Sequence, residues 1–170
     1  MKKDKEYIEA KKLAANYLNA RKEFVNKAKQ IESLNGSDNI MGRIGELIAL
    51  RFLKIEKNYN LIKSFKKNEK DYDLHSLDKS IRVSVKLISC ENVDGQTTKI
   101  TGDWTDFVLV HLKDYKVFEI GYVHRSGYEK AVEDGLIKNN PLTRRTMLGK
   151  EHLLGKYGIV KRGKQVHGYL

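Results

Sequence analysis

Residues 81–89 read IRVSVKLIS, and this stretch decides the fold. Apolar and polar side chains alternate along it, which is the pattern of a β-strand whose two faces differ. The sequence therefore predicts a strand over residues 80–88, with Ser84 and Lys86 on one face because they are two positions apart. Two apolar segments further along, residues 107–112 and 117–123, predict strands in the middle of a covered sheet.

Two helices are predicted before this strand. Residues 5–34 contain no Gly or Pro and repeat small or apolar side chains every three or four positions, which indicates one long amphipathic helix. Residues 40–53 are apolar on nearly every side and predict a buried helix that carries Glu46. A buried carboxylate requires a partner, and Arg43 and Arg51 are its nearest candidates. Glu46 is therefore either half of a structural ion pair or part of a site.

Shorter elements complete the prediction. Strands are expected near residues 61–65 and 71–74, and Ser126 is expected to cap a helix over residues 127–134. In the last thirty residues we expect one short helix over 143–154. A small hairpin is expected there too, pairing residues 159–161 with 165–169. The whole is predicted to be one α/β domain with a mixed central sheet flanked by helices.

Composition limits the class of protein. The chain has 170 residues, of which 40% are hydrophobic, enough for one domain with a core of its own. The single cysteine, Cys90, excludes a disulfide framework and a Cys-rich zinc site. No apolar run approaches the ~20 residues of a membrane helix, and the N-terminus has no apolar signal core. We therefore expect a cytoplasmic protein with no membrane partner.

The positive charge is concentrated at the two ends of the chain. The formal net charge is +11, yet residues 31–137 carry 16 basic and 17 acidic side chains. Residues 1–30 contribute +5 and residues 138–170 contribute +7. We divide the single domain, 1–170, into a helical extension (1–35), a core (40–135) and a basic C-terminal segment (138–170). Basic surfaces favour polyanions such as nucleic acid, although a lysine-rich surface can also serve solubility alone.

Four residues in the core suggest chemistry. Asp73 precedes Ser84 by eleven positions, which leaves room for two antiparallel strands joined by a tight connection at residues 75–79. Such a hairpin would bring Asp73 beside Lys86. A carboxylate next to a lysine at a sheet edge can hold a divalent metal and orient a water for attack on phosphate. Glu46 on the buried helix is the fourth candidate.

This order of elements resembles the PD-(D/E)XK nuclease superfamily, which includes restriction endonucleases, junction resolvases and repair nucleases. The resemblance covers GRIGELIALRFL (42–53), KDYDLHS (70–76), IRVSVKLIS (81–89) and TDFVLVHL (105–112). It implies a restriction-endonuclease-like fold and Mg²⁺ as cofactor, with Mn²⁺ as a substitute. Asp73 and Glu46 would bind the metal together with the Val85 carbonyl, and Lys86 would position the attacking water.

The sequence departs from the superfamily pattern at Ser84. This serine stands where the superfamily has Asp or Glu, and a hydroxyl is a weaker metal ligand than a carboxylate. Glu46 or Glu91 would have to compensate, or else the protein binds nucleic acid without cutting it. Asp71 competes with Asp73 for the metal, and we prefer Asp73 because it lies deeper in the predicted strand.

Candidate DNA contacts lie in the basic C-terminal segment. Arg144 and Arg145 stand between two threonines, and Lys161, Arg162 and Lys164 are expected at the tip of the hairpin. These observations favour a Mg²⁺-dependent endonuclease acting on double-stranded DNA, as a homodimer because cutting both strands suits two-fold symmetry. A type II restriction enzyme is the first subclass. The alternatives are a junction or repair nuclease, a non-catalytic nucleic-acid-binding protein, and an assembly protein that uses its N-terminal helix.

Overall fold

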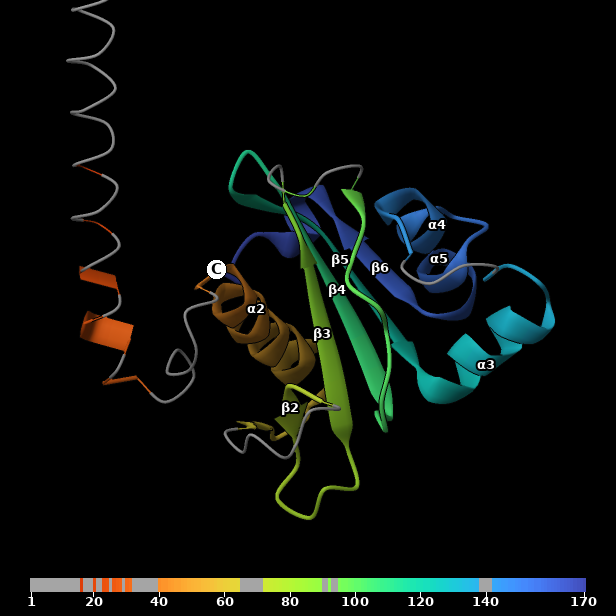
Figure 1. Ribbon diagram of the computed structural model, residues 1–170, viewed down its shortest axis with the longest axis horizontal. Helices are drawn as coiled ribbons and strands as arrows, with labels where there is room; N and C mark the ends of the chain where they lie inside the picture. The colour runs from red at the N-terminus through yellow and green to blue at the C-terminus, as the bar shows by residue number, and fades with distance from the viewer. Residues whose placement is uncertain are drawn as a thin grey trace, which may run out of the picture.

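A computed structural model describes residues 16, 20, 23–24, 26–28, 30–31, 40–64, 72–89, 92, 95–137 and 142–170 (Figure 1). Its elements follow in chain order: α2 (Ile40–Lys57), β1 (Ile62–Lys63), β2 (Leu74–His75), β3 (Arg82–Ile88), β4 (Asp106–Lys113), β5 (Lys116–His124), α3 (Arg125–Glu133), α4 (Arg144–Leu148), α5 (Leu153–Tyr157), β6 (Ile159–Arg162) and the 3-10 turn η3 (Gly163–Val166). The predicted α/β class is confirmed.

The six strands form one mixed sheet in the order β1-β2-β3-β4-β5-β6. Neighbouring strands are antiparallel except β3 and β4, which run parallel. A parallel pair needs a long connection, and residues 89–105 supply it. The predicted strands over 80–88, 107–112 and 117–123 correspond to β3, β4 and β5, the longest in the sheet.

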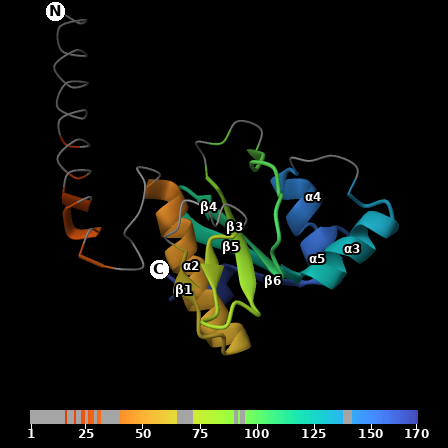
Figure 2. The ribbon, with the colours of Figure 1, turned by 60° about the horizontal axis from the view of Figure 1, so that its bottom comes forward.

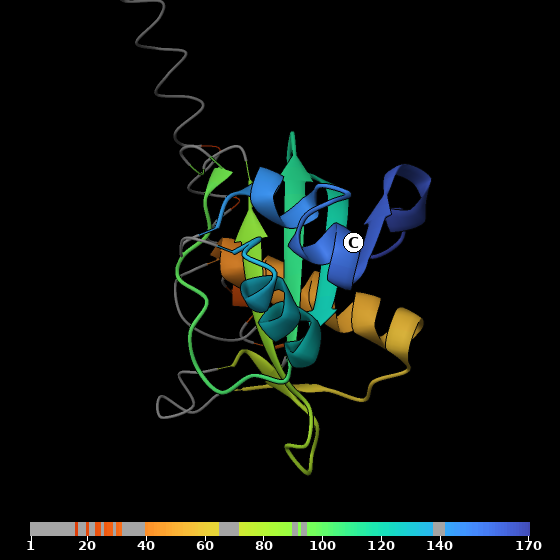
Figure 3. The ribbon, with the colours of Figure 1, turned by 90° about the vertical axis from the view of Figure 1, so that its right-hand side faces the viewer.

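Helices cover both faces of the sheet. Helix α2 lies against one face, and α3, α4 and α5 gather on the other (Figures 1 and 3). Alternate residues of β3 and β4 accordingly enter two hydrophobic clusters, one with α2 and one with the C-terminal helices. Figure 2 shows α2 and the C-terminal helices on opposite sides of the strands. Because both faces are covered, β4 is buried along most of its length.

Helix α2 is held close to β3 by a glycine. An added Cβ at Gly45 would lie 3.1 Å from two side-chain atoms of Leu87, so the helix backbone approaches the strand at this point. The helix runs to Lys57, four residues beyond the prediction. The positive charges of Lys54 and Lys57 in its last turn interact favourably with the negative end of the helix dipole. Within the described part of the chain, no helix is both long and apolar enough to cross a membrane.

The C-terminal third differs from its predicted structure. The helix expected over 143–154 is two short helices, α4 and α5, and Thr143 is the N-cap of the first. The expected hairpin is absent from these fully described residues: β6 pairs with β5, and η3 occupies the start of the second arm. The cap of α3 is His124 rather than Ser126, because the His124 ring accepts the N–H of Ser126.

The predicted N-terminal helix falls mostly outside the described residues. Those that are described between 16 and 28 are helical, whereas Gln30 and Ile31 lie in a turn and a bend. The helix therefore ends before residue 34. The division of the domain into extension, core and basic segment stays a prediction.

Candidate functional site

Asp73 lies where β2 leaves the edge of β3. Its backbone N–H donates to the Val83 carbonyl at 2.8 Å, which starts the β2–β3 hairpin that the sequence predicts. Within β3, the described partners of β2 are Arg82 and Val83, so the edge of β3 continues beyond Val83 without β2 beside it. The next N–H on this edge, that of Val85, donates to Asp73 Oδ2 at 2.6 Å. The Asp73 side chain thus accepts a hydrogen bond that a neighbouring strand would otherwise accept. This bond fixes the orientation of the Asp73 carboxylate.

The Val85 carbonyl belongs to the same edge. In a β-strand the N–H and C=O of one residue point to the same side. Because the Val85 N–H meets Asp73, its carbonyl oxygen also faces the edge that β2 has left. Further along, the Ser89 N–H donates to the Asn92 side-chain oxygen at 2.7 Å. The β3 edge between these two bonds therefore presents main-chain groups beside an aspartate.

Glu46 is paired with Lys63, a residue that the sequence analysis did not single out. Lys63 Nζ lies 2.5 Å from Glu46 Oε2, and the two side chains are 7% and 16% exposed. The predicted partners play smaller parts: Arg43 is buried nearby and Arg51 is exposed. Lys63 comes from β1, a strand of two residues, which is too short for its alternation to indicate which side chain is buried.

Electrostatics couple the two carboxylates. Burial raises the pKa of Glu46, the Lys63 ammonium opposes this rise, and the charge of Asp73 adds to it. Burial also raises the pKa of Asp73, against the Val85 hydrogen bond and the charges of Lys86 and Lys63. Two carboxylates held near each other, with pKa values above the ordinary range, form a site that would gain from a cation.

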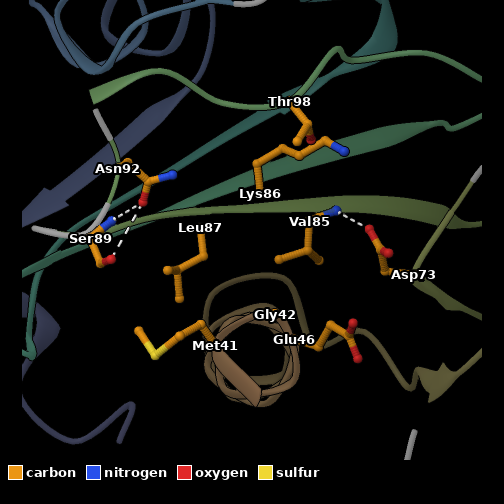
Figure 4. Close-up of a pocket in the computed structure, with 10 residues that line it drawn as sticks. All are labelled: Met41, Gly42, Glu46, Asp73, Val85, Lys86, Leu87, Ser89, Asn92 and Thr98. Carbon is orange, nitrogen blue, oxygen red and sulfur yellow. Dashed lines mark hydrogen bonds between the residues drawn. The ribbon is translucent and has the colours of Figure 1, made fainter. Parts of the chain in front are cut away.

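These residues surround one cavity of about 440 Å³ (Figure 4). Val85 and Leu87 point toward α2, whereas Lys86 points away from the helix and lies beside Thr98. Glu46 and Asp73 occupy the same end of the cavity, and Lys86 is close enough to Asp73 to lower its pKa. The cavity is lined by Met41, Gly42, Glu46, Asp73, Val85, Lys86, Leu87, Ser89, Asn92 and Thr98.

Four of the five predicted metal and catalytic positions, Glu46, Asp73, Val85 and Lys86, therefore line one cavity, although the Lys86 side chain points away from α2; Ser84 does not line it. Ser84 is 4% exposed and pairs with Phe107 of β4, and it does not line the cavity. Asp71, the competitor of Asp73, and Glu91, the proposed substitute for a carboxylate at position 84, lie outside the described residues.

The donor set around the cavity suits a hard divalent cation. Mg²⁺ prefers oxygen ligands and is usually held by one or two carboxylates with several waters. Glu46 and Asp73 supply two carboxylates, and the Val85 carbonyl supplies a third oxygen on the β3 edge. The mutual repulsion of the two carboxylates is an observation of this structure that a cation would relieve. The residues present fit the predicted Mg²⁺.

The predicted DNA contacts are distributed over two faces. Arg144 and Arg162 meet on Glu119, a buried carboxylate on β5 that the sequence analysis did not single out. Lys161 pairs with Glu56 of α2 at 2.9 Å. Arg145 and Lys164 are exposed. In the sequence, Glu119 is a charged residue inside the apolar segment VFEIGYV. That pattern is the signal that could have identified it.

Comparison of the chain with protein-family models and with curated proteins found no match to either.

Proposed function

We propose that this protein is a Mg²⁺-dependent DNA endonuclease of the PD-(D/E)XK type, with a restriction-endonuclease-like core. One observation carries the proposal: Glu46, Asp73, Val85 and Lys86 line a single cavity at the edge of β3. They come from a buried helix, the start of a hairpin and a central strand, in the order that the superfamily motif requires. The raised pKa values of both carboxylates add support, because such shifts concentrate at functional sites.

Each residue has a role in this proposal. Asp73 and Glu46, with the Val85 carbonyl, would hold the ion, and the bond from the Val85 N–H keeps the Asp73 carboxylate in one orientation. When bound, Mg²⁺ would stabilise the charge that develops on the phosphate and favour ionisation of a water. Lys86 projects from the same strand, and its ammonium group would orient the attacking water toward the phosphorus.

The biological setting follows from the same proposal. The substrate would be double-stranded DNA, which suits a net charge of +11, and the protein would act in the cytoplasm. A homodimer would place two cavities on the two strands, and a type II restriction endonuclease is the first subclass. A junction or repair nuclease would use the same site chemistry.

One observation favours a second candidate, a nucleic-acid-binding protein without catalysis. Ser84 occupies the position of a superfamily carboxylate, is buried and does not line the cavity. The site would then lack a ligand that most superfamily members have.

A plasmid assay separates the two candidates. The full chain is incubated with supercoiled plasmid in Mg²⁺, in Mn²⁺ and in EDTA, beside Lys86→Ala. A nuclease yields nicked or linear DNA in either metal, none in EDTA, and a large loss with the variant. A gel shift with no cleavage in any divalent ion supports the binding protein and overturns the proposal.

A further inference from the structure

A second charged cluster lies on the sheet, outside the cavity. Glu119 is 4% exposed, and its Oε2 accepts from Arg144 at 2.9 Å for Nε and 2.8 Å for Nη2. Its Oε1 accepts from Arg162 Nε at 2.7 Å. His111 Nδ1 lies 3.0 Å from Oε2. One buried carboxylate thus holds two guanidinium groups that are 18 residues apart in sequence.

Both guanidinium groups keep a free edge. Arg162 also donates through Nη2 to the Leu148 carbonyl. Among the described residues, the contacts of Arg144 and Arg162 use only Nε and Nη2, so Nη1 of each is available. Their side chains are 42% and 48% exposed. Glu119 holds both guanidinium groups in place, and their exposed sides face solvent. Such arginines can bind an anion with little loss of side-chain entropy.

The cluster carries excess positive charge. Burial lowers the pKa of His111, so its ring is neutral near pH 7. Two arginines and one glutamate then leave a net charge of +1. Lys113 and Lys116, which pair at the end of the β4–β5 hairpin, add one further net positive charge together with Asp114 in the turn between them. Glu119 neutralises only one of the two guanidinium groups, so one positive charge is left that a phosphate could neutralise.

The cluster also shares a sheet face with Lys86. Ile88, His111, Glu119 and Arg162 are partners in one row across β3, β4, β5 and β6. Lys86 is two residues before Ile88 and therefore projects from the same face. Arg162 lies three strands across the sheet from β3, and Lys86 lies two residues along β3 from the row that contains Arg162. With ordinary strand spacing and rise, the two backbones are about 16 Å apart. That distance spans roughly five nucleotides of one DNA strand along the axis.

Residues 95–98 connect the cavity to the arginine cluster. Thr98 lines the cavity beside Lys86, and Gln96 forms a bridge with Thr143, the cap of α4. Gly95 packs against Arg144, since an added Cβ there would lie 3.7 Å from the Arg144 Cβ. The rim of the cavity thus leads directly to the first residue of α4.

We propose that Arg144 and Arg162, oriented by Glu119, form one phosphate-binding unit that grips the DNA backbone a few nucleotides from the phosphodiester in the cavity. This inference rests on the proposed function for its substrate. It differs from the sequence prediction, which paired Arg144 with Arg145. Glu119 is a positioning residue in this unit.

The test measures binding of a fluorescein-labelled 30-bp duplex of arbitrary sequence by fluorescence anisotropy, in EDTA so that nothing is cut. Arg144→Lys and Arg162→Lys keep the charge and lose the planar fork; Arg51→Lys, exposed on the α2 side, is the matched control. Each single variant should raise Kd about tenfold. The double variant should lose about 10–20-fold in affinity. Two independent sites would instead multiply their tenfold losses to about a hundredfold. Circular dichroism melts verify that each variant is folded.

Either of two results with the variants would overturn the inference: Kd values within twofold of the control, or fully additive losses of affinity. Absence of binding by the wild-type chain would overturn it as well. The plasmid assay reports separately on the proposed function. A chain that binds through this unit yet never cuts would refute the nuclease and leave the phosphate-binding unit standing.

Discussion

At the residue scale, the cavity is built from charges that do not balance on their own. Asp73 accepts one hydrogen bond from the strand and is attracted by the charges of Lys86 and Lys63, yet burial still raises its pKa. Glu46 is in the same condition although Lys63 touches it. The proposed Mg²⁺ would offset this cost of burial at both carboxylates.

This imbalance predicts that Asp73→Asn stabilises the metal-free protein. A carboxyl group whose pKa is raised on folding contributes stability below its unfolded pKa, near 4, and loses it as pH rises through the folded value. Asparagine keeps the acceptor for the Val85 N–H and has no such loss. We expect Tm in EDTA at pH 8 to rise by about 2–4 °C, the equivalent of ~1 kcal/mol. At pH 4 the difference should disappear. A lower Tm than wild type at pH 8 would contradict this account.

Lys63 occupies the place of a cation beside Glu46, so it should compete with a metal for that carboxylate. Lys63→Met removes the competitor and keeps the apolar stem of the side chain. We expect the variant to bind Mn²⁺ about tenfold more tightly than wild type, as read by electron paramagnetic resonance of free Mn²⁺ without DNA. Glu46→Gln should weaken binding. Equal affinity in wild type and Lys63→Met would mean that the ion pair is separate from the metal site.

At the element scale, the position of α4 depends on α5. Gly155 of α5 lies against the turn that ends α4, and an added Cβ there would lie 2.8 Å from the backbone Cα of Lys150. Close packing of these two short helices therefore requires the smallest residue at position 155.

Gly155→Ala should therefore destabilise the protein by about 1–3 kcal/mol, because backbone atoms cannot rotate away from the new methyl group. Urea denaturation followed by circular dichroism measures the change, with Glu151→Ala as an exposed neighbour control. The same variant should weaken DNA binding, since α4 carries Arg144. An unfolding free energy within 0.5 kcal/mol of wild type, a surface-like effect, would show that α4 and α5 adjust freely.

The sequence predicted the elements whose pattern is local. Strand β3 has strict alternation, and β4 and β5 are continuous apolar runs, so their positions follow from residue order alone. The hairpin that brings Asp73 to the edge of β3 was predictable for the same reason. Lys63 was not, because its partner Glu46 is on another element and only the folded sheet brings them together. The hairpin strand predicted at 165–169 does not form, because residues 159–162 pair with β5 instead.

At the scale of the whole molecule, the basic C-terminal segment and the candidate site are separate along the chain but lie on one sheet. The segment 31–137 is nearly neutral and supplies every residue around the cavity, whereas Arg144 and Arg162 come from the basic C-terminal segment. The fold places both on one sheet, with the arginines on the face from which Lys86 projects.

Binding of the 30-bp duplex should consequently depend steeply on salt. If four phosphates are contacted, log Kd changes by about 0.9 per phosphate with log[NaCl], and affinity falls about 100-fold between 50 and 200 mM. Neutralising Arg144 and Arg145 together should reduce the slope and weaken binding of every sequence. An affinity that changes less than threefold over this range would argue against a DNA substrate.

The most direct test of the central claim is the single-turnover rate of phosphodiester cleavage in saturating Mg²⁺. Wild type, Asp73→Asn, Lys86→Ala and the exposed control Lys130→Ala are compared on the same end-labelled duplex. We predict losses of at least about 1000-fold for Asp73→Asn and Lys86→Ala, with Lys130→Ala near the wild-type rate. Cleavage at the wild-type rate by either cavity variant, or none by the wild-type protein in Mg²⁺ or Mn²⁺, would contradict it.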